Sequence, residues 1–153
     1  MSVEIVGPVE TNVQDCERIL RALPAYFGIE EALLQYLKDI VDMPVFFALR
    51  DGKSIGFLAI NRHTKLSAEI HVMGVLPEEH RKGVGSALTA AAEQYLKSDG
   101  VKILEVKTLG ESHPDKNYAQ TRKFYLTQGF LPLEEIHDFW GKGLPTLFMV
   151  KLL

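Results

Sequence analysis

A short run of residues in the middle of the chain combines positive charge with glycine, which suits the binding of an anion. The run is His80-Arg81-Lys82-Gly83-Val84-Gly85-Ser86, and it leads from an apolar segment and Pro77 into an apolar-periodic helix. A loop that enters a helix presents unpaired backbone N–H groups and the positive end of the helix dipole. Glycine lets a ligand approach the backbone closely, and the three basic side chains add positive potential. We therefore expect this run to hold a pyrophosphate.

Two well-known phosphate-binding loops do not fit these residues. The loop of phosphate-binding NTPases needs Gly-Lys followed by Ser or Thr, whereas here Lys82 precedes its glycine and Val84 follows it. The dinucleotide fingerprint needs a third glycine, and Leu88 stands in its place. The alternative is that the two glycines merely turn a strand into a helix. The preceding proline, the basic triplet and the apolar helix together favour an anion site over that alternative.

At these residues the sequence resembles the coenzyme A loop of the GNAT superfamily of N-acetyltransferases. The family pattern is Gln or Arg, two residues, Gly, any residue, then Gly or Ala, and the stretch here is HRKGVGSAL preceded by VLP. The first position is His80 instead, with Arg81 beside it, so the sequence does not decide which of the two side chains contacts the phosphate. The resemblance continues through residues 68–75 and 124–130 and hardly covers the N-terminal third. It implies acetyl-CoA as the cosubstrate.

The resemblance also implies where the rest of the coenzyme lies. In the family, the strand before the loop splays from its neighbour and its backbone pairs with the pantetheine arm, which here points to Met73 and Val75. A backbone N–H near Val75 would face the thioester carbonyl. Asn117 resembles the family asparagine that contacts the coenzyme, although it precedes Tyr125 by eight residues instead of the usual seven.

Tyr125 is the expected catalytic acid. It lies four residues before Gly129 in FYLTQGF, which matches the family signature Tyr-x-x-x-Gly-Phe, where the tyrosine protonates the departing sulfur. The ordinary pKa values of a thiol, ~8.5, and of a tyrosine, ~10, make full transfer uphill by roughly 2 kcal/mol, so a strong hydrogen bond would suffice. The alternative is a core aromatic residue beside Phe124.

Glu69 and His71 are the candidate bases that would remove a proton from the amine. Glu69 lies six residues before Val75, where family members that acetylate lysine carry a glutamate. His71 follows on the same strand face and would act more readily near neutral pH, directly or through water. The alternative for both is an exposed strand face, and the sequence does not decide between these interpretations.

The histidines and the single cysteine give no metal signature. His63, His71, His80, His113 and His137 lack paired His or Cys spacing, so we expect no metal. Cys16 cannot form an intrachain disulfide, and its apolar-periodic surroundings indicate a packed small hydrophobic residue.

Length and composition fit one soluble enzyme-sized domain over residues 1–153. Net charge is −3 with 46% hydrophobic residues, which favours neither nucleic acid nor an anionic membrane as a partner. The first residues lack a basic region followed by an apolar core, and no apolar run approaches the ~20 residues of a membrane span. We expect a cytoplasmic protein.

The elements that must position these residues can be read from periodicity and breakers. Asn12 should cap a helix over 13–23 that Pro24 ends, and Asp51-Gly52 predicts a hairpin. Val75 has the opposite parity to Ile70 and Val72, which predicts a bulge at Met73-Gly74. The other expected helices are 29–41, 84–96 and 117–128, and the expected strands are 3–6 (ended by Gly7-Pro8), 45–49, 54–60, 69–75, 101–108, 130–133 and 146–152. This order predicts an α/β fold, which the resemblance makes GNAT-like: one mixed, mostly antiparallel sheet with a splayed parallel pair and helices on both faces.

The acceptor site is the least readable part of the sequence. The two N-terminal helices border it in the family, and the loop 111–115 and the segment 134–145 are expected to form its rim. For Phe139 and Trp140 the alternative is cover for the sheet or contact with a second copy of the chain. We expect an N-acetyltransferase that moves the acetyl group directly to a small-molecule or protein amine. The alternative is a catalytically silent acyl-CoA-binding module.

Overall fold

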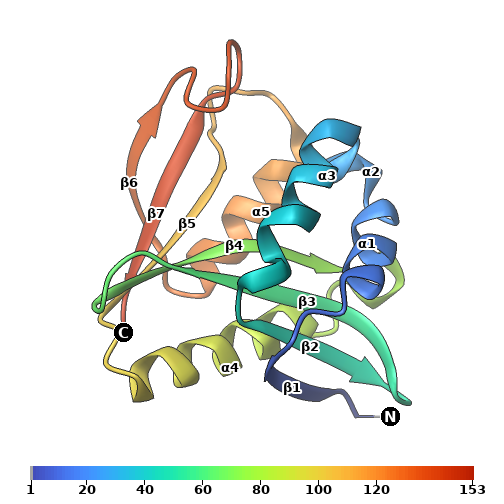
Figure 1. Cartoon of the computed structure of the whole chain (residues 1–153). Helices are drawn as coiled ribbons and strands as arrows, with labels where there is room; N and C mark the ends of the chain where they lie inside the picture. Colours follow the sequence, from blue (N-terminus) through green and yellow to red (C-terminus); the bar gives the residue numbers. More distant parts are fainter. Residues whose placement is uncertain (1) are drawn as a thin grey trace.

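The computed structural model describes residues 2–153 and is built on one mixed sheet (Figure 1). Within that range the sheet has seven strands in the order β1-β2-β3-β4-β5-β7-β6. The strands are β1 (Glu4–Val9), β2 (Val45–Arg50), β3 (Lys53–Arg62), β4 (Ser67–Val75), β5 (Ile103–Leu109), β6 (Leu131–Ile136) and β7 (Thr146–Leu152). The helices are α1 (Val13–Arg21), α2 (Pro24–Phe27), α3 (Glu30–Asp39), α4 (Val84–Ser98) and α5 (Lys116–Thr127), with 3-10 turns at Ile40–Asp42 and Pro77–Glu79.

The two central strands, β4 and β5, are the only parallel pair in the described part of the chain. The pairing begins at Ser67 and Ile103 and ends at Ile70 and Val106. Beyond that point β4 continues to Val75 with β3 as its only strand partner among residues 2–153. The expected mixed sheet with one splayed parallel pair is therefore confirmed.

Helices cover both faces of this sheet, as expected. Figure 1 shows α1 and α3 on one side of the strands and α4 on the other. Gly74 of β4 allows α1 to approach, because a Cβ there would lie 3.1 Å from Ile19 and 3.4 Å from Leu20. On the opposite face, a Cβ at Gly56 of β3 would lie 3.4 Å from Leu88 of α4. The core thus lies in two layers, one on each side of the central strands.

Glycines with positive φ lie in the hairpin turn and after two helices, at the positions that the sequence indicated. Asp51 and Gly52 have φ angles of 53° and 78°, which is the signature of a type I′ turn between β2 and β3. Gly100 and Gly129, with φ angles of 85° and 96°, follow α4 and α5. Each helix end carries the hydrogen bonds of a Schellman motif, including Phe130 N–H to the Tyr125 carbonyl at 3.0 Å.

Three boundaries differ from the prediction for physical reasons. Strand β1 does not end at Gly7-Pro8 but runs to Val9 with a register shift, which an edge strand tolerates because its outer N–H groups need no partner. Pro24 does not end α1, which stops at Arg21, but begins α2, since proline fits the first turn of a helix. The expected helix over 29–41 is α3 followed by a 3-10 turn.

Candidate active site

A cavity of about 360 Å³ lies where β4 and β5 diverge. Its lining comes from the ends of both strands, from α2 and α3 on one side, from the loop before α4, and from α5. One end is therefore formed by the basic glycine loop. The other end is formed by aromatic and polar side chains of the N-terminal helices and the diverging strands.

A bulge in β4 aims side chains into this cavity. The pairing with β3 shifts between Val72 and Ile70, so His71 is the additional residue. His71 contacts α3 and Gly74 faces α1, on the same side of the sheet. Residues on one face of a regular strand are an even number of positions apart. His71 and Gly74 are an odd number apart, so the strand must contain one extra residue. The predicted bulge is therefore present but lies at His71, not at Met73-Gly74, because packing against α3 and α1 fixes both ends.

The first turn of α4 is built to receive an anion. Helices α1 and α5 have side-chain caps, Asn12 and Asp115, which accept hydrogen bonds from first-turn N–H groups. Among residues 2–153, no side chain caps α4, whose N-cap residue is Gly83. Arg81 and Gly83 adopt left-handed φ angles of 62° and 81°, a conformation that turns loop N–H groups toward one point. Helix α3 also lacks a side-chain cap, so the distinctive feature of α4 is the combination of an uncapped first turn with these loop angles, which leaves its N–H groups available to a ligand.

The charges around this loop are partly neutralised within the protein. Glu79, which lines the cavity, is 7% exposed and accepts hydrogen bonds of 2.8 and 3.1 Å from Arg50. Those hydrogen bonds lower the pKa of Glu79 against the opposing effect of burial. Lys82 lies 3.9 Å from the same carboxylate and, of the described residues, is not among those that line the cavity. Arg81 is therefore the basic side chain of the loop best placed for an anion.

His80 has a structural contact of its own. Its Nε2 lies 2.7 Å from the carbonyl oxygen of Val75, so the ring N–H is donated to the end of β4. This contact joins the loop to the splayed strand. His80, Met73, Val75 and the residues Gly83, Val84, Gly85 and Ser86 all line the cavity, so the structure brings these predicted donor-binding residues together.

Gly85 has a packing role that the sequence did not reveal. A Cβ at this position would lie 3.2 Å from the Phe124 ring of α5, so glycine lets the two helices meet. Gln128 of α5 also donates a 2.8 Å hydrogen bond to the Ser86 hydroxyl. Between these helices a second hollow of about 470 Å³, lined in part by Arg81 and Lys123, continues outward from the loop.

Tyr125 projects from α5 into the cavity. It is 6% exposed, and its ring packs edge-on against Phe124 and Phe130 with centroids 5.3 and 5.4 Å away. Burial, with a smaller contribution from Tyr36, raises the pKa of Tyr125. Its hydroxyl has no hydrogen-bond partner in the part of the chain that the structure describes. A fixed neutral phenol with a free O–H is suited to donate a hydrogen bond to a ligand.

The two candidate bases are placed differently. His71 lines the cavity, and its Nε2 lies 3.0 Å from Oδ2 of Asp39 on α3. Glu69 is buried, and within residues 2–153 it is not part of the cavity lining. Its carboxylate is held by His63 at 2.8 Å and by Lys107 at 2.9 Å. Of the two, His71 is the one in position to meet an acceptor.

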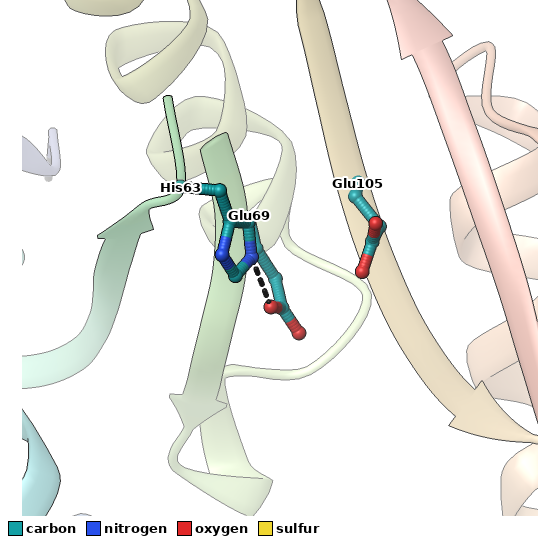
Figure 2. Close-up of side chains that lie close together, drawn as sticks. All are labelled: His63, Glu69 and Glu105. Carbon is teal, nitrogen blue, oxygen red and sulfur yellow. Dashed lines mark hydrogen bonds and ion pairs between the residues drawn. The ribbon is translucent and has the colours of Figure 1, made fainter. Parts of the chain in front are cut away.

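The second histidine–carboxylate pair belongs to a small cluster on the sheet. Figure 2 shows His63 directed at Glu69, with Glu105 on the neighbouring strand. Their ligand-type atoms lie within 4.8 Å of one another, a spacing that a metal ion could use. Lys107, however, contacts Glu69 at 2.9 Å and Glu105 at 2.7 Å. Burial opposes its charge, but these hydrogen bonds outweigh burial and raise the pKa of Lys107. The Lys107 ammonium therefore occupies the place between the two carboxylates that a metal ion would take.

Other residues of the site were placed less accurately by the sequence. Among the described residues, Asn117 does not line the cavity; its carbonyl accepts a 3.2 Å hydrogen bond from Tyr26. Gln120 and Thr121, one turn later on α5, line it instead. Trp140 lines the cavity, as expected for the rim. The segment from 134 begins as strand β6, which ends at Ile136.

Five aromatic or basic lining residues were missed: Tyr26, Phe27, Tyr36, Lys107 and Tyr118. Tyr36 occurs in the apolar stripe of a helix, and Lys107 alternates with buried residues in a strand, so both match ordinary structural patterns. Only the recurrence of tyrosine in the helices could have drawn attention to the aromatic residues, and no sequence signal marked Lys107.

The fold joins a splayed parallel strand pair to a cavity that ends at a helix start without a side-chain cap. A family model described as Acetyltransferase (GNAT) family matches residues 14–130. The chain belongs to the GNAT family of acetyltransferases.

Solved structures and relatives agree with this assignment. A protein assigned to the GNAT family from Desulfovibrio desulfuricans superposes with a TM-score of 0.84 at 19% identity, over 99% of both chains. The PaiA N-acetyltransferase of Thermoplasma acidophilum, solved with coenzyme A, has a TM-score of 0.76 at 20% identity over 100% of both chains. A mycothiol acetyltransferase from Actinosynnema mirum is 30% identical over 87 residues, which is 56% of this chain and 29% of that protein. The chain thus matches under a third of that relative.

In residues 2–153 no helix has both the length and the apolar character required to cross a bilayer.

Proposed function

We propose that residues 1–153 form one catalytic domain, an acetyl-CoA-dependent N-acetyltransferase that acts in the cytoplasm on primary amines. One observation carries the proposal: a single cavity joins the uncapped first turn of α4, the unpaired backbone of β4 and the free hydroxyl of Tyr125. A donor with a pyrophosphate, an amide-bearing arm and a thioester needs these three features in that order.

The donor-binding roles follow from the backbone. The first-turn N–H groups of α4, at Val84, Gly85 and Ser86, would receive the pyrophosphate. Arg81 would add a charge-assisted hydrogen bond. The edge of β4 at Met73 and Val75, which β5 leaves unpaired, would pair with the pantetheine amides as a neighbouring strand would.

Transfer then requires three events at the splayed end of the cavity. The neutral amine nitrogen attacks the thioester carbon, the bond from that carbon to sulfur breaks, and the proton lost by the amine goes to His71. Tyr125 donates its O–H to the departing sulfur, where negative charge develops. Because its raised pKa keeps the phenol protonated, the donor is available throughout the neutral range. Water then removes the proton from His71 and returns one to Tyr125, so the enzyme is restored and the products are an amide and a free thiol.

The acceptor class is set by the opposite end of the cavity. Its lining is rich in aromatic rings, including Tyr26, Phe27, Tyr36 and Trp140, which favour an amine with a flat or apolar body. Small aromatic amines and the amines of peptides both meet this requirement. The aligned relative is named for mycothiol, but the short match leaves that acceptor as one candidate to test.

The test is a panel assay of thiol release from acetyl-CoA. Phenylethylamine, spermidine, an alanine-initiated peptide and a lysine-containing peptide serve as acceptors, and mass spectrometry identifies the acetylated product. We expect turnover above hydrolysis with at least one amine and a lower rate in Tyr125→Phe. Binding of coenzyme A without turnover on the whole panel would favour the silent acyl-CoA-binding module instead.

A further inference from the structure

Two histidine–carboxylate pairs occur within residues 2–153, and they differ in what surrounds them. In the pair His71–Asp39, the histidine lines the cavity and the side chains are 19% and 29% exposed. In the pair His63–Glu69, the histidine is 39% exposed, the carboxylate is 8% exposed, and neither, among residues 2–153, lines the cavity. Of these two pairs, only the first places its imidazole in the cavity.

Asp39 is held so that it can fix this imidazole. Its Oδ2 lies 3.0 Å from Nε2 of His71, and its Oδ1 accepts a 2.7 Å hydrogen bond from Gln35, one turn earlier on α3. Tyr36 packs edge-on against the His71 ring, with centroids 5.6 Å apart. Both carboxylate oxygens are thus engaged, and the ring is held from two directions.

The hydrogen bond also decides which nitrogen can accept a proton. A carboxylate only accepts hydrogen bonds, so Nε2 of neutral His71 carries the hydrogen and Nδ1 carries the lone pair. In the described residues Nδ1 has no hydrogen-bond partner. Once Nδ1 is protonated, the imidazolium is stabilised by the negative charge of Asp39.

The position of Asp39 is unfavourable for the helix that carries it. It is the last residue of α3, where the negative end of the helix dipole disfavours another negative charge. The same dipole end favours a cation, such as a protonated His71, beside it. Helix stability therefore does not account for this carboxylate, whereas a partner that becomes positively charged does.

We propose that Asp39 is a positioning residue: it holds His71 in the Nε2–H form and leaves Nδ1 to take the proton of the acceptor amine. This inference rests on the proposed function, in which His71 is the base. Among residues 2–153, the other titratable or charged groups packed around this side of the cavity include Tyr36 on α3, Glu69 on β4, Glu105 and Lys107 on β5, and Tyr118 and Tyr125 on α5. Lys107 is shared by Glu69 and Glu105, so these three groups together carry a net negative charge.

Two measurements test the role of Asp39, and the first needs no acceptor. In ¹⁵N-labelled protein the ring-nitrogen shifts of His71, assigned by their loss in His71→Gln, report which nitrogen carries the hydrogen. We expect the Nε2–H form in the wild type. In Asp39→Asn the Nδ1–H form should also appear, since an amide can donate a hydrogen bond to Nε2 as well as accept one from it. The same single form in both proteins would overturn the proposal.

The second measurement is a double-mutant cycle in kcat/KM with acetyl-CoA and phenylethylamine, or the panel member that reacts fastest. His71→Gln should lower kcat/KM about 100-fold near neutral pH, and Asp39→Asn about tenfold. If Asp39 acts only through His71, adding Asp39→Asn to His71→Gln causes no further loss. An equal loss in both backgrounds would make Asp39 a structural residue and overturn the proposal.

A matched control variant and the wild-type activity distinguish failure of the Asp39 proposal from failure of the proposed function. His63→Gln breaks the other pair and should retain nearly wild-type kcat/KM and the Nε2–H form of His71. A rate loss in His63→Gln as large as that in His71→Gln would contradict the assignment of the base. No turnover by the wild type with any acceptor would overturn the proposed function and the catalytic role of Asp39 together. Full activity in His71→Gln would overturn His71 as the base and with it the role of Asp39, while the acetyltransferase activity itself would stand.

Discussion

The two ends of the cavity are built in different ways. The end proposed to bind the donor (the donor end) comes from one continuous stretch, in which β4 leads through a 3-10 turn into the first turn of α4. The end proposed to bind the acceptor (the acceptor end) is assembled from α2, α3, α5, the diverging strands and Trp140, which are far apart in the sequence. The donor end uses backbone N–H groups, whereas the acceptor end uses side chains.

This difference has a functional consequence. Backbone groups at a helix start bind the same phosphate whatever the neighbouring side chains are, so the donor end can stay constant while other parts vary. An end made of side chains from several elements changes its shape with each substitution. The acceptor can therefore differ between proteins that share the donor site, and substitutions at the two ends should have separable effects on affinity and turnover.

The largest expected effect is at the junction of the two ends. Tyr125→Phe should lower kcat by about 10–100-fold with little change in acetyl-CoA affinity, because a hydrogen bond to a charged group is worth about 1.5–3 kcal/mol. Steady-state kinetics and calorimetry measure the two quantities.

Tyr95→Phe is the matched control for Tyr125→Phe. Tyr95 lies on α4, packs against Phe46, and is not among the described residues that line the cavity. It should leave kcat unchanged. Wild-type kcat in Tyr125→Phe, under conditions where chemistry limits turnover, would reduce Tyr125 to a packing residue.

A tenfold effect is expected from the shape of the donor loop. In Gly83→Ala a Cβ is forced into a left-handed conformation, at a cost of about 1–2 kcal/mol. The loop then turns its N–H groups away, and coenzyme A affinity measured by calorimetry should fall about tenfold.

Gly100→Ala provides the comparison for Gly83→Ala. Gly100 follows the other end of α4 with a φ angle of 85°, against 81° for Gly83. In residues 2–153 a Cβ at either site would meet no heavy atom within 4 Å. Both variants carry the same backbone strain, so thermal stability should fall in Gly100→Ala without loss of affinity. Equal affinity losses would mean that general destabilisation explains both.

The smallest effect is expected from exposed charge at the donor end. Neutralising Arg81 and Lys82 together, as Arg81→Gln and Lys82→Gln, should weaken coenzyme A binding roughly twofold to fivefold, since exposed charges contribute little. The dependence of affinity on salt concentration should flatten, because only charge-based attraction is screened. An unaltered salt dependence would assign both side chains to the solvated surface.

The same contrast explains what the sequence could reveal. The donor loop could be predicted from the sequence because its residues are adjacent, and a strand, a proline, a basic run and glycines occur in a fixed order. The hairpin at Asp51-Gly52 and the ends of α4 and α5 could be predicted for the same reason, since local backbone preferences determine them.

The acceptor end could not be predicted from the sequence because it is formed by contacts between residues that are far apart in the chain. Asp39 looks like an ordinary helix-terminal residue until α3 packs against His71, and Tyr36 looks like part of an apolar stripe. The bulge at His71 depends on how β4 meets both α1 and α3. Glu69 had the right spacing for a base, but Lys107 from a neighbouring strand occupies its carboxylate, which no local pattern indicates.

The most direct test of the account is where coenzyme A binds. Addition of coenzyme A to ¹⁵N-labelled protein should shift amide resonances in two separate stretches, the splayed part of β4 at 71–75 and the start of α4 at 83–86. Gly83→Ala should reduce the shifts in both stretches, because one ligand spans them. Shifts confined to one stretch, or centred on the edge strand β6, would contradict a single donor site running along this cavity.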